Sequence, residues 1–300
     1  MDVAITGASG LIGGALARSL ATDGHQVRPV SRRPGGSATI TWDPEAGTID
    51  AAALEGVDAV VHLAGAGVAS GPWTDEQRRK IKESRTKGTT LLASTLAGLD
   101  RKPSVLVSGS AIGYYGDRGD EELTERSTPG EDFLAQVCVA WEASTVAAHD
   151  AGIRVAHVRT GIVLGTEGGA FPKLLLPFKL GLGGPDGDGK GWFSWITLED
   201  EVRAIRFLLD HDVQGPVNLT APNPVRSKEL AKTLGGVLHR PAVLPVPRFI
   251  TKLPFGVGDL VESLLFTSAK VQPTVLQAAG FEFTQPHLEG ALRAVLGKAA

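Results

Sequence analysis

The sequence predicts an α/β fold in which a doubly wound parallel sheet carries a smaller C-terminal α/β lobe. Short apolar segments alternate with longer segments of helical apolar spacing, which is typical of parallel strands joined by helices. Three glycines stand in the turn between the first expected strand and the first expected helix. After Thr166 glycine becomes dense ahead of an aromatic segment at residues 192–196, which indicates the start of a second lobe.

The expected strands and helices follow one another along the chain. The first helix covers residues 11–21, and a second covers 74–96 and opens with the capping-box sequence Thr74-Asp75-Glu76-Gln77. A third helix, 132–150, is closed by Gly152. The strands expected from short apolar runs are residues 1–6, 26–30, 39–42, 59–63, 104–107 and 154–158.

The glycine-rich turn has the spacing and the setting of a phosphate-binding loop. Gly7 permits the tight turn, Gly10 lets a pyrophosphate approach the backbone, and Gly13 lets the helix pack closely on the strand. Backbone amides and the helix N-terminus then face the negative charge. The turn therefore predicts a Rossmann-like, dinucleotide-binding sheet. The residues expected to contact the dinucleotide here are Gly7, Ser9, Gly10, Leu11, Ile12 and Gly13.

The end of the second strand indicates which dinucleotide binds. It carries Ser31, Arg32 and Arg33, where an NAD-preferring enzyme usually has an acidic residue for the ribose hydroxyls. A hydroxyl and two guanidinium groups suit a 2′-phosphate instead. We therefore expect NADP(H) to be preferred over NAD(H); the alternative is a solvated basic turn.

Composition excludes several classes of function. A net charge of -3 with dispersed charges argues against nucleic acid binding, and no apolar run approaches membrane-spanning length. The first strand begins almost at Met1, which leaves no room for a signal peptide, so we expect a cytoplasmic protein. The single cysteine, Cys138, makes no internal disulfide, and the seven histidines form no close pair, so no metal site is expected. A small-molecule substrate is the expected partner, and a homo-oligomer remains open.

Further segments resemble the extended, epimerase-like branch of the short-chain dehydrogenase/reductase superfamily. A closer resemblance is to a subgroup of epimerase-family proteins of uncharacterised activity that carry a C-terminal domain of unknown function. The general marks are residues 62–65, 108–110 and 114–116. The marks of the subgroup are residues 136–138, 141–142, 159–164, 192–196 and 278–283.

The resemblance implies a domain division and more cofactor contacts. Residues 1–165 would form the NADP(H)-binding Rossmann domain, and residues 166–300 mainly the substrate lobe and C-terminal domain, with residues 217–219 returning to the sheet. Arg85 occupies a position where extended members often have asparagine, and it would bring positive charge to a substrate or to the cofactor phosphates; the alternative is an exposed helix arginine. The cofactor contacts implied are Leu63, Ala64, Gly65, Arg85, Ser108, Gly109, Thr160, Gly161 and Ile162.

One mark of the superfamily's chemistry is missing. Its members usually place a catalytic tyrosine four residues before a lysine on one helix face. The two tyrosines, Tyr114 and Tyr115, are followed at that spacing by Arg118 and Gly119. Counting back from residue 142 aligns the tyrosine position with Leu134 and the lysine position with Cys138, so both functional groups are absent.

Other residues are candidates for the chemistry. Ser110 aligns with the family's catalytic serine, with Ser108 as the competing assignment. Tyr114 is our candidate proton donor, with Tyr115 beside it; loop packing or substrate stacking is the alternative for both. For Cys138 we expect a core position. We also expect Glu142, one turn beyond Cys138, to pair with an arginine rather than to transfer protons.

Two functions remain after these observations. The first is an NADP(H)-binding oxidoreductase or epimerase-like enzyme that acts on a small hydroxyl- or carbonyl-bearing substrate, with nucleotide sugars suggested by family analogy. The second is a non-catalytic module that senses NADP(H) and presents its C-terminal domain to a protein partner. The proline-rich segment 240–255 is either an exposed adaptor for that partner or a rigid connection between lobes.

Overall fold

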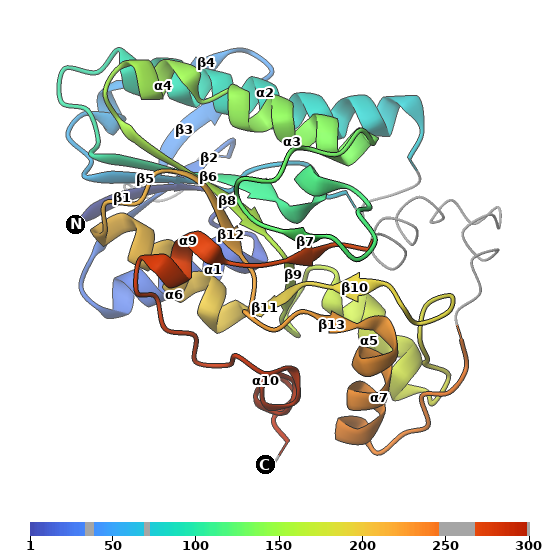
Figure 1. Cartoon of the computed structure of the whole chain (residues 1–300). Helices are drawn as coiled ribbons and strands as arrows, with labels where there is room; N and C mark the ends of the chain where they lie inside the picture. The colour runs from blue at the N-terminus through green and yellow to red at the C-terminus, as the bar shows by residue number, and fades with distance from the viewer. Residues whose placement is uncertain (34–38, 69–72, 246–267, 299–300) are drawn as a thin grey trace.

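A computed structural model describes residues 1–33, 39–68, 73–245 and 268–298 of the chain (Figure 1). Its centre is an eight-stranded sheet of order β12-β8-β6-β5-β1-β2-β3-β4. All neighbouring strands are parallel except β3 and β4, which are antiparallel. The strands are β1 (Asp2–Thr6), β2 (Gln26–Ser31), β3 (Ile40–Asp43), β4 (Thr48–Ile49), β5 (Ala59–His62), β6 (Val105–Ala111), β8 (Arg154–Thr160) and β12 (Gly215–Leu219).

The sheet confirms the predicted fold class. Strand order runs outward from β1 to β2 and β3 on one side and from β5 to β6, β8 and β12 on the other. Successive strands are therefore added in opposite directions from β1 and from β5, although the two strands are parallel, and a crevice opens at their carboxyl ends. Every residue of β5 is buried, as expected for a parallel strand covered on both faces.

Helices cover both faces of the sheet. On one face, α2 (Asp75–Ala97), α3 (Phe133–Ala143) and α4 (Val146–Asp150) lie together in Figure 1, and α2 buries Leu92 and Leu96 beneath them. On the other face lie α1 (Leu11–Thr22), α6 (Leu198–Asp210) and α9 (Thr274–Ala278). At the predicted capping sequence of α2, the Thr74 hydroxyl accepts a hydrogen bond from the Gln77 amide at 3.2 Å and caps the helix N-terminus.

The prediction of one long helix over residues 132–150 was wrong. The helix stops after Ala143, and α4 starts at Val146. At the break, the Ser144 hydroxyl donates to the Ala140 carbonyl at 2.7 Å and the Thr145 hydroxyl donates to the Glu142 carbonyl at 2.8 Å. Hydroxyls that bond to nearby carbonyls compete with the helical pattern, which explains why the chain bends here.

The predicted aromatic strand at residues 192–196 was also wrong, because it is two strands with different partners. β10 (Trp192–Phe193) pairs antiparallel with β13 (Val225–Arg226), whereas β11 (Trp195–Thr197) pairs parallel with β9 (Ile162–Leu164). Ser194 separates them, since its buried hydroxyl donates to the Ala269 carbonyl at 2.7 Å and accepts from the Val271 amide at 3.0 Å.

These short strands lie between the sheet and a second lobe. The lobe packs its own apolar core around Phe171, Trp195 and Leu234. Its helices are α5 (Phe171–Lys179), α7 (Ser227–Leu238) and α10 (Leu288–Val295). The remaining elements are η1 (Ala52–Leu54), η2 (Ile112–Tyr115), β7 (Glu122–Leu123) and β14 (Lys270–Val271).

Membrane-spanning helices and metal-binding clusters are both absent from the residues that the structure describes. No described helix is both long and apolar enough to cross a membrane. In the same parts of the chain, histidine, cysteine and acidic residues form no cluster of three or more that is placed to hold a metal ion. Of the proline-rich segment 240–255, residues 246–255 lie outside the described residues.

Candidate cofactor and active site

The glycine turn is shaped so that only glycine fits at its key positions. Gly7 has a φ of 71°, and the Gly10 amide donates to the Gly7 carbonyl at 2.9 Å. A Cβ on Gly13 would lie 2.3 Å from the Gly7 carbonyl oxygen, and one on Gly7 would lie 2.9 Å from the Leu63 carbonyl. These contacts hold the turn tightly between α1 and the end of β5, so that backbone amides face the crevice.

Thr6 fixes the neighbouring loop at the point where strand order reverses. Its hydroxyl oxygen accepts from the Leu63 amide at 3.0 Å and the Ala64 amide at 3.1 Å. The Thr6 hydroxyl hydrogen is then left to donate to His62 Nδ1 at 2.8 Å, so Nε2 carries the ring proton toward Thr89 at 2.8 Å. Burial lowers the pKa of His62 to about 4, which keeps this ring neutral.

Two connected hollows form the cleft beside the turn. The larger has a volume of about 1100 Å³ and holds the end of β2, while the smaller, of about 320 Å³, reaches β6 and β8. Gly7, Gly10 and Leu63 line both. The predicted residues in the larger hollow are Gly7, Ser9, Gly10, Ser31, Arg32, Arg33, Leu63, Ala64 and Gly65. Those in the smaller are Gly7, Gly10, Leu11, Ile12, Gly13, Leu63, Gly109, Ser110, Thr160, Gly161 and Ile162.

Arg32 and Arg33 are exposed at the rim of the larger hollow. The Arg33 amide donates to the Ser31 hydroxyl at 3.1 Å, which bends the chain so that all three residues line the same space. Lys80 of α2 adds a third cation to this hollow. The donor set therefore suits a phosphate group on the ribose side of the cleft.

Three predicted site residues do not line either hollow. Ser108 is fully buried and its hydroxyl has no hydrogen-bond partner within the described part of the chain. Arg85 stacks on Trp141, with 4.9 Å from Cζ to the ring centre, and donates to the Ala66 carbonyl at 3.0 Å. Tyr114 lies under Arg159, with 3.4 Å from the guanidinium carbon to the ring centre.

Ser110, which the sequence aligns with the family's catalytic serine, lines the smaller hollow. Its Oγ donates to Glu142 Oε1 at 2.7 Å. The same carboxylate receives two bonds from Arg159, from Nε at 2.8 Å and from Nη2 at 2.9 Å. The expected ion pair of Glu142 with an arginine is therefore present, and Arg159 is its partner.

Arg159 is enclosed as well as paired. Burial alone would lower its pKa, but the bonds to Glu142 outweigh this effect and raise the pKa above its usual range. Its Nη1 donates to the Tyr115 hydroxyl at 3.1 Å, and that hydroxyl donates to Asn218 Oδ1 at 2.6 Å. Burial raises the pKa of Tyr115 to about 12, so its phenol stays protonated. Tyr115 therefore acts as a structural link.

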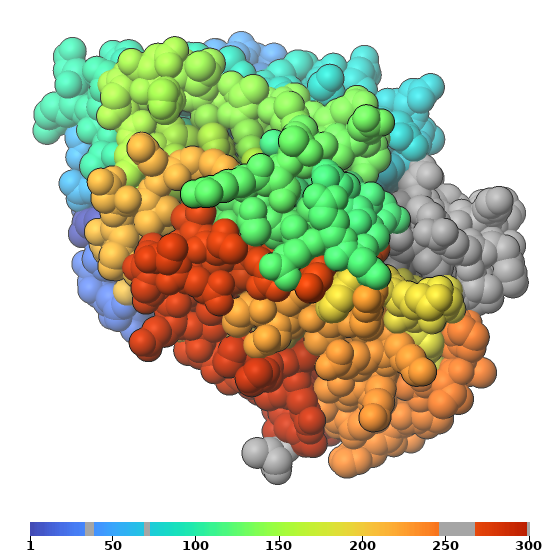
Figure 2. All heavy atoms as spheres, viewed as in Figure 1, coloured from blue at the N-terminus to red at the C-terminus, as the bar shows by residue number. Residues whose placement is uncertain are grey.

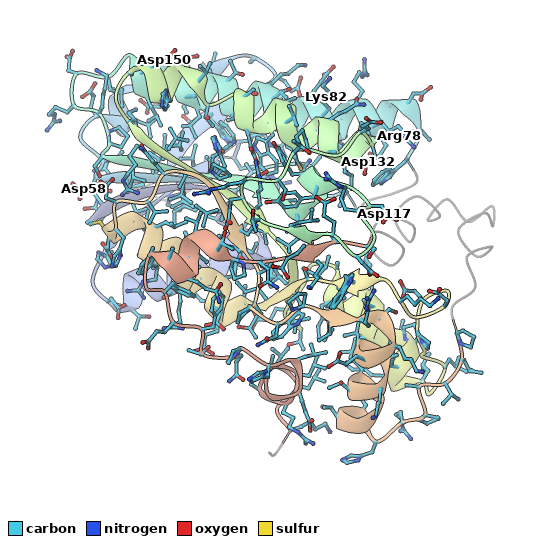
Figure 3. The ribbon with its side chains drawn as sticks, in the orientation of Figure 1. Asp58, Arg78, Lys82, Asp117, Asp132 and Asp150 are labelled. Carbon is cyan, nitrogen blue, oxygen red and sulfur yellow. The ribbon has the colours of Figure 1, made fainter. Side chains whose placement is uncertain are left out.

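The residues aligned in the sequence with the superfamily's tyrosine and lysine carry no phenol and no ammonium. Leu134 and Cys138 both lie on α3, and Cys138 is buried with its thiol pKa raised by burial to about 11. Figure 3 shows Asp132, which caps this helix, near Arg78 of α2, and Arg78 stacks on Phe133 at 5.1 Å. These contacts hold α3 against α2 and set the position of Glu142.

Sequence reasoning missed several residues of the cleft. Trp141 lines the smaller hollow and packs against Gly109, where a Cβ would lie 2.8 Å from the indole ring. Trp141 could have been found from its place in residues 141–142, which are one of the segments that resemble the subgroup. Val163, Gly169 and Ala170 also line the smaller hollow. No local motif marks the other residues that line the larger one, which are Val30, Trp42, Pro44, Glu45, Ala66, Gly67, Lys80 and Ser84.

Comparison with known proteins identifies the family of the chain. A protein-family model described as the NAD dependent epimerase/dehydratase family matches residues 3–220. The chain belongs to this family. A second model, a domain of unknown function (DUF1731), matches residues 246–295. The resemblance to the subgroup with a C-terminal domain of unknown function is thereby confirmed.

Individual members of the epimerase family are similar over most of the chain. An epimerase family protein of Mycobacterium bovis, Mb2239, is 40% identical over 94% of this chain and 93% of its own length. The crystal structure of human SDR39U1 (isoform 2) with NADPH has a TM-score of 0.91 and 34% identity, covering 100% of both chains. The nucleoside-diphosphate sugar epimerase of Corynebacterium glutamicum has a TM-score of 0.82 and 37% identity over 99% of this chain and 58% of that one.

Proposed function

We propose that the chain is an NADP(H)-dependent oxidoreductase whose substrate presents a hydroxyl group to Ser110. The observation that carries this proposal is the Ser110 hydroxyl, which lines the smaller hollow while its hydrogen is directed to Glu142 at 2.7 Å. A hydroxyl that already donates its hydrogen offers only lone pairs to a second partner. Ser110 is thus set to accept a hydrogen bond, which an alcohol supplies and a carbonyl does not.

The cleft supports NADP(H) as the cofactor. The turn at Gly7, Gly10 and Gly13 leaves room for a pyrophosphate, and Arg32 and Arg33 line the hollow that would hold the 2′-phosphate. The human relative crystallised with NADPH points the same way. When bound, NADP(H) supplies or takes up the hydride. In domain terms, residues 1–165 would hold this cofactor and residues 166–300 would supply most of the substrate lobe.

Glu142 serves Ser110 best as a fixed carboxylate. Its two bonds to Arg159 neutralise a guanidinium that is only 3% exposed. A bidentate pair of this kind holds the carboxylate in one orientation. Glu142 therefore orients Ser110, and Ser110 orients the substrate hydroxyl. Oxidation of such an alcohol gives a carbonyl product, a hydride on the cofactor and a proton released to water.

The test is a screen for NADP(H)-linked turnover with alcohols and their carbonyl counterparts, beginning with nucleotide sugars because of the Corynebacterium neighbour. Ser110→Ala should lower turnover by about 100-fold or more. Ser108→Ala is the matched control, because Ser108 lies two residues away on β6 and lines neither hollow. Equal activity in both variants and the unmodified protein would remove the role of Ser110.

The alternative is a non-catalytic NADP(H) sensor, and one observation favours it. Leu134 and Cys138 stand where the superfamily usually has its proton donor and lysine, and the Tyr115 phenol is sealed in the core. A sensor would bind NADPH with the same preference but would oxidise or reduce nothing in the screen. Turnover that depends on Ser110 excludes it.

A further inference from the structure

Asn218 of β12 extends the hydrogen-bond chain that begins at Ser110. Its Oδ1 accepts from the Tyr115 hydroxyl, while its Nδ2 donates to the Gln272 carbonyl at 2.9 Å. The second bond fixes which end of the amide faces Tyr115. The backbone amide of Asn218 also donates to Glu125 Oε1 at 3.1 Å. Asn218 therefore joins Tyr115 to Gln272 and to Glu125.

Glu125 connects the same hydrogen-bond chain to the start of α9. Its side chain is buried, and its carboxylate accepts from the Val275 amide at 3.2 Å and from the Thr274 hydroxyl. Its own carbonyl oxygen accepts from Arg159 Nη1 at 3.5 Å. Glu125 thus contacts both the guanidinium that holds Glu142 and the helix that follows β14.

The residues at the far end of this chain belong to the C-terminal domain. Gln272, Thr274 and Val275 all fall within the residues that match the domain of unknown function. β14 pairs in parallel with β7, and the Gln272 amide donates to the Leu123 carbonyl at 2.8 Å. Figure 2 shows the C-terminal segment, in red, packed against the green residues that follow β6. The C-terminal segment is therefore part of the wall behind the active site.

We propose that residues 272–275 of the C-terminal domain position Ser110 through this hydrogen-bond chain, and that Glu125 and Asn218 are positioning residues. The inference rests on the proposed role of Ser110. Each step is a direct contact: Thr274 and Val275 hold Glu125, Gln272 holds Asn218, and Asn218 holds Tyr115. Tyr115 in turn holds Arg159, whose other nitrogens hold the carboxylate that receives the Ser110 hydrogen.

Two conservative variants each interrupt the hydrogen-bond chain without removing a ring or a methyl-sized group. Tyr115→Phe removes the hydroxyl that joins Arg159 to Asn218, and Thr274→Val removes the hydroxyl that holds Glu125. The matched control is Ser268→Ala. Ser268 bonds the same C-terminal segment to the Gly119 carbonyl at 2.8 Å and to the Trp192 amide at 3.0 Å, outside the chain.

The experiment measures hydrogen exchange of the Arg159 Nε proton by NMR, assigned by its loss in Arg159→Lys. NADPH affinity, the melting temperature, and kcat and KM for the substrate found in the screen are measured alongside. In Tyr115→Phe and Thr274→Val we expect exchange to accelerate by about tenfold or more and kcat to fall by about tenfold, while NADPH affinity stays within about twofold. In Ser268→Ala we expect a lower melting temperature only.

The proposal is overturned if the Arg159 proton exchanges at the same rate in Tyr115→Phe and Thr274→Val as in the unmodified protein. It is equally overturned if Ser268→Ala changes the Arg159 proton exchange and kcat as much as Tyr115→Phe and Thr274→Val do. The hydrogen bonds of the chain would then act only through overall stability. If the unmodified protein turns over no substrate, the proposed function fails, and the Arg159 signal still decides whether the C-terminal segment holds the Glu142–Arg159 pair.

Discussion

The Glu142 carboxylate receives two parallel hydrogen bonds from Arg159, at 2.8 and 2.9 Å, and this pair is nearly sealed from water. A carboxylate and a guanidinium paired in this geometry hold one another in a fixed orientation. The hydroxyl of Ser110 therefore meets an acceptor that does not move, and its remaining lone pairs face the cleft. The site thus has a fixed hydrogen-bond acceptor one helical turn beyond Cys138, which the sequence aligns with the superfamily's lysine.

Removing one partner of this pair should be more harmful than removing both. Arg159→Met leaves Glu142 buried without its partner, and we expect unfolding free energy to fall by about 3 to 5 kcal/mol. The double variant Arg159→Met with Glu142→Leu should recover part of this loss, because no unpaired charge remains. Denaturant unfolding of the cofactor-free proteins measures both. A double variant less stable than Arg159→Met would contradict the assignment.

The cofactor preference should depend on the two arginines at the end of β2. Arg32→Ala combined with Arg33→Ala should weaken NADPH binding by about tenfold or more and leave NADH binding nearly unchanged, because only NADPH has the 2′-phosphate. Arg101→Ala is the control, since Arg101 is exposed and lines neither hollow. Titrations followed by nicotinamide fluorescence provide the affinities. Equal losses for both cofactors would remove the 2′-phosphate argument.

Gly13 should tolerate no side chain. A Cβ there would lie 2.3 Å from the Gly7 carbonyl oxygen, so Gly13→Ala must displace the turn that faces the pyrophosphate. We expect NADPH affinity to fall by about 100-fold or more. In contrast, a Cβ on Gly236 of α7 meets no atom within 4 Å, so Gly236→Ala should raise stability by about 1 kcal/mol without changing affinity. Normal NADPH binding by Gly13→Ala would show that the turn does not hold the cofactor.

Glu201 should make stability depend on pH between about 4.5 and 8. It is fully buried on α6, where burial raises its pKa to about 8, and its Oε1 accepts from the Thr160 hydroxyl at 2.8 Å. The folded protein keeps the proton up to about pH 8, whereas the unfolded chain loses it near pH 4.5. Stability is therefore highest below pH 4.5 with respect to this group and falls as pH rises to 8.

The matched variant for this dependence is Glu201→Gln, which has a similar shape and no titration. From pH 5 to pH 8, the unfolding free energy of the unmodified protein should fall by a few kcal/mol relative to that of Glu201→Gln. Urea unfolding at several pH values measures it. Parallel pH profiles for the two proteins would show that Glu201 ionises in the folded state as easily as in the unfolded one.

Local patterns were sufficient to predict the sheet and the cofactor cleft. The turn from Gly7 to Gly13 and the basic end of β2 are contiguous segments whose roles follow from backbone geometry and charge, and both line the cleft as expected. Which arginine pairs with Glu142 was not predicted, because Arg159 lies on β8 and Glu142 on α3, and only the folding of the chain brings them together. Helix α3 ended early for a similar reason, because the Thr145 hydroxyl also bonds to His157 of β8.

The role of the C-terminal segment had no local signal at all. Asn218, Gln272 and Thr274 are ordinary polar residues in the sequence. Their proposed role rests on contacts with residues 54 to 149 positions away along the chain: Asn218 with Tyr115, Gln272 with Asn218, and Thr274 with Glu125. Such long-range hydrogen bonds carry no periodicity or spacing that a single sequence reveals.

The central claim, that this cleft is an NADP(H) site, is tested most directly by titrating purified, cofactor-stripped protein with NADPH and with NADH. Nicotinamide fluorescence reports the two affinities. The arrangement of Gly7, Gly10, Arg32 and Arg33 predicts saturable binding of both with clear preference for NADPH. Binding of neither nucleotide would contradict the claim and remove the enzyme and the sensor together, and tighter binding of NADH would contradict the cofactor assignment.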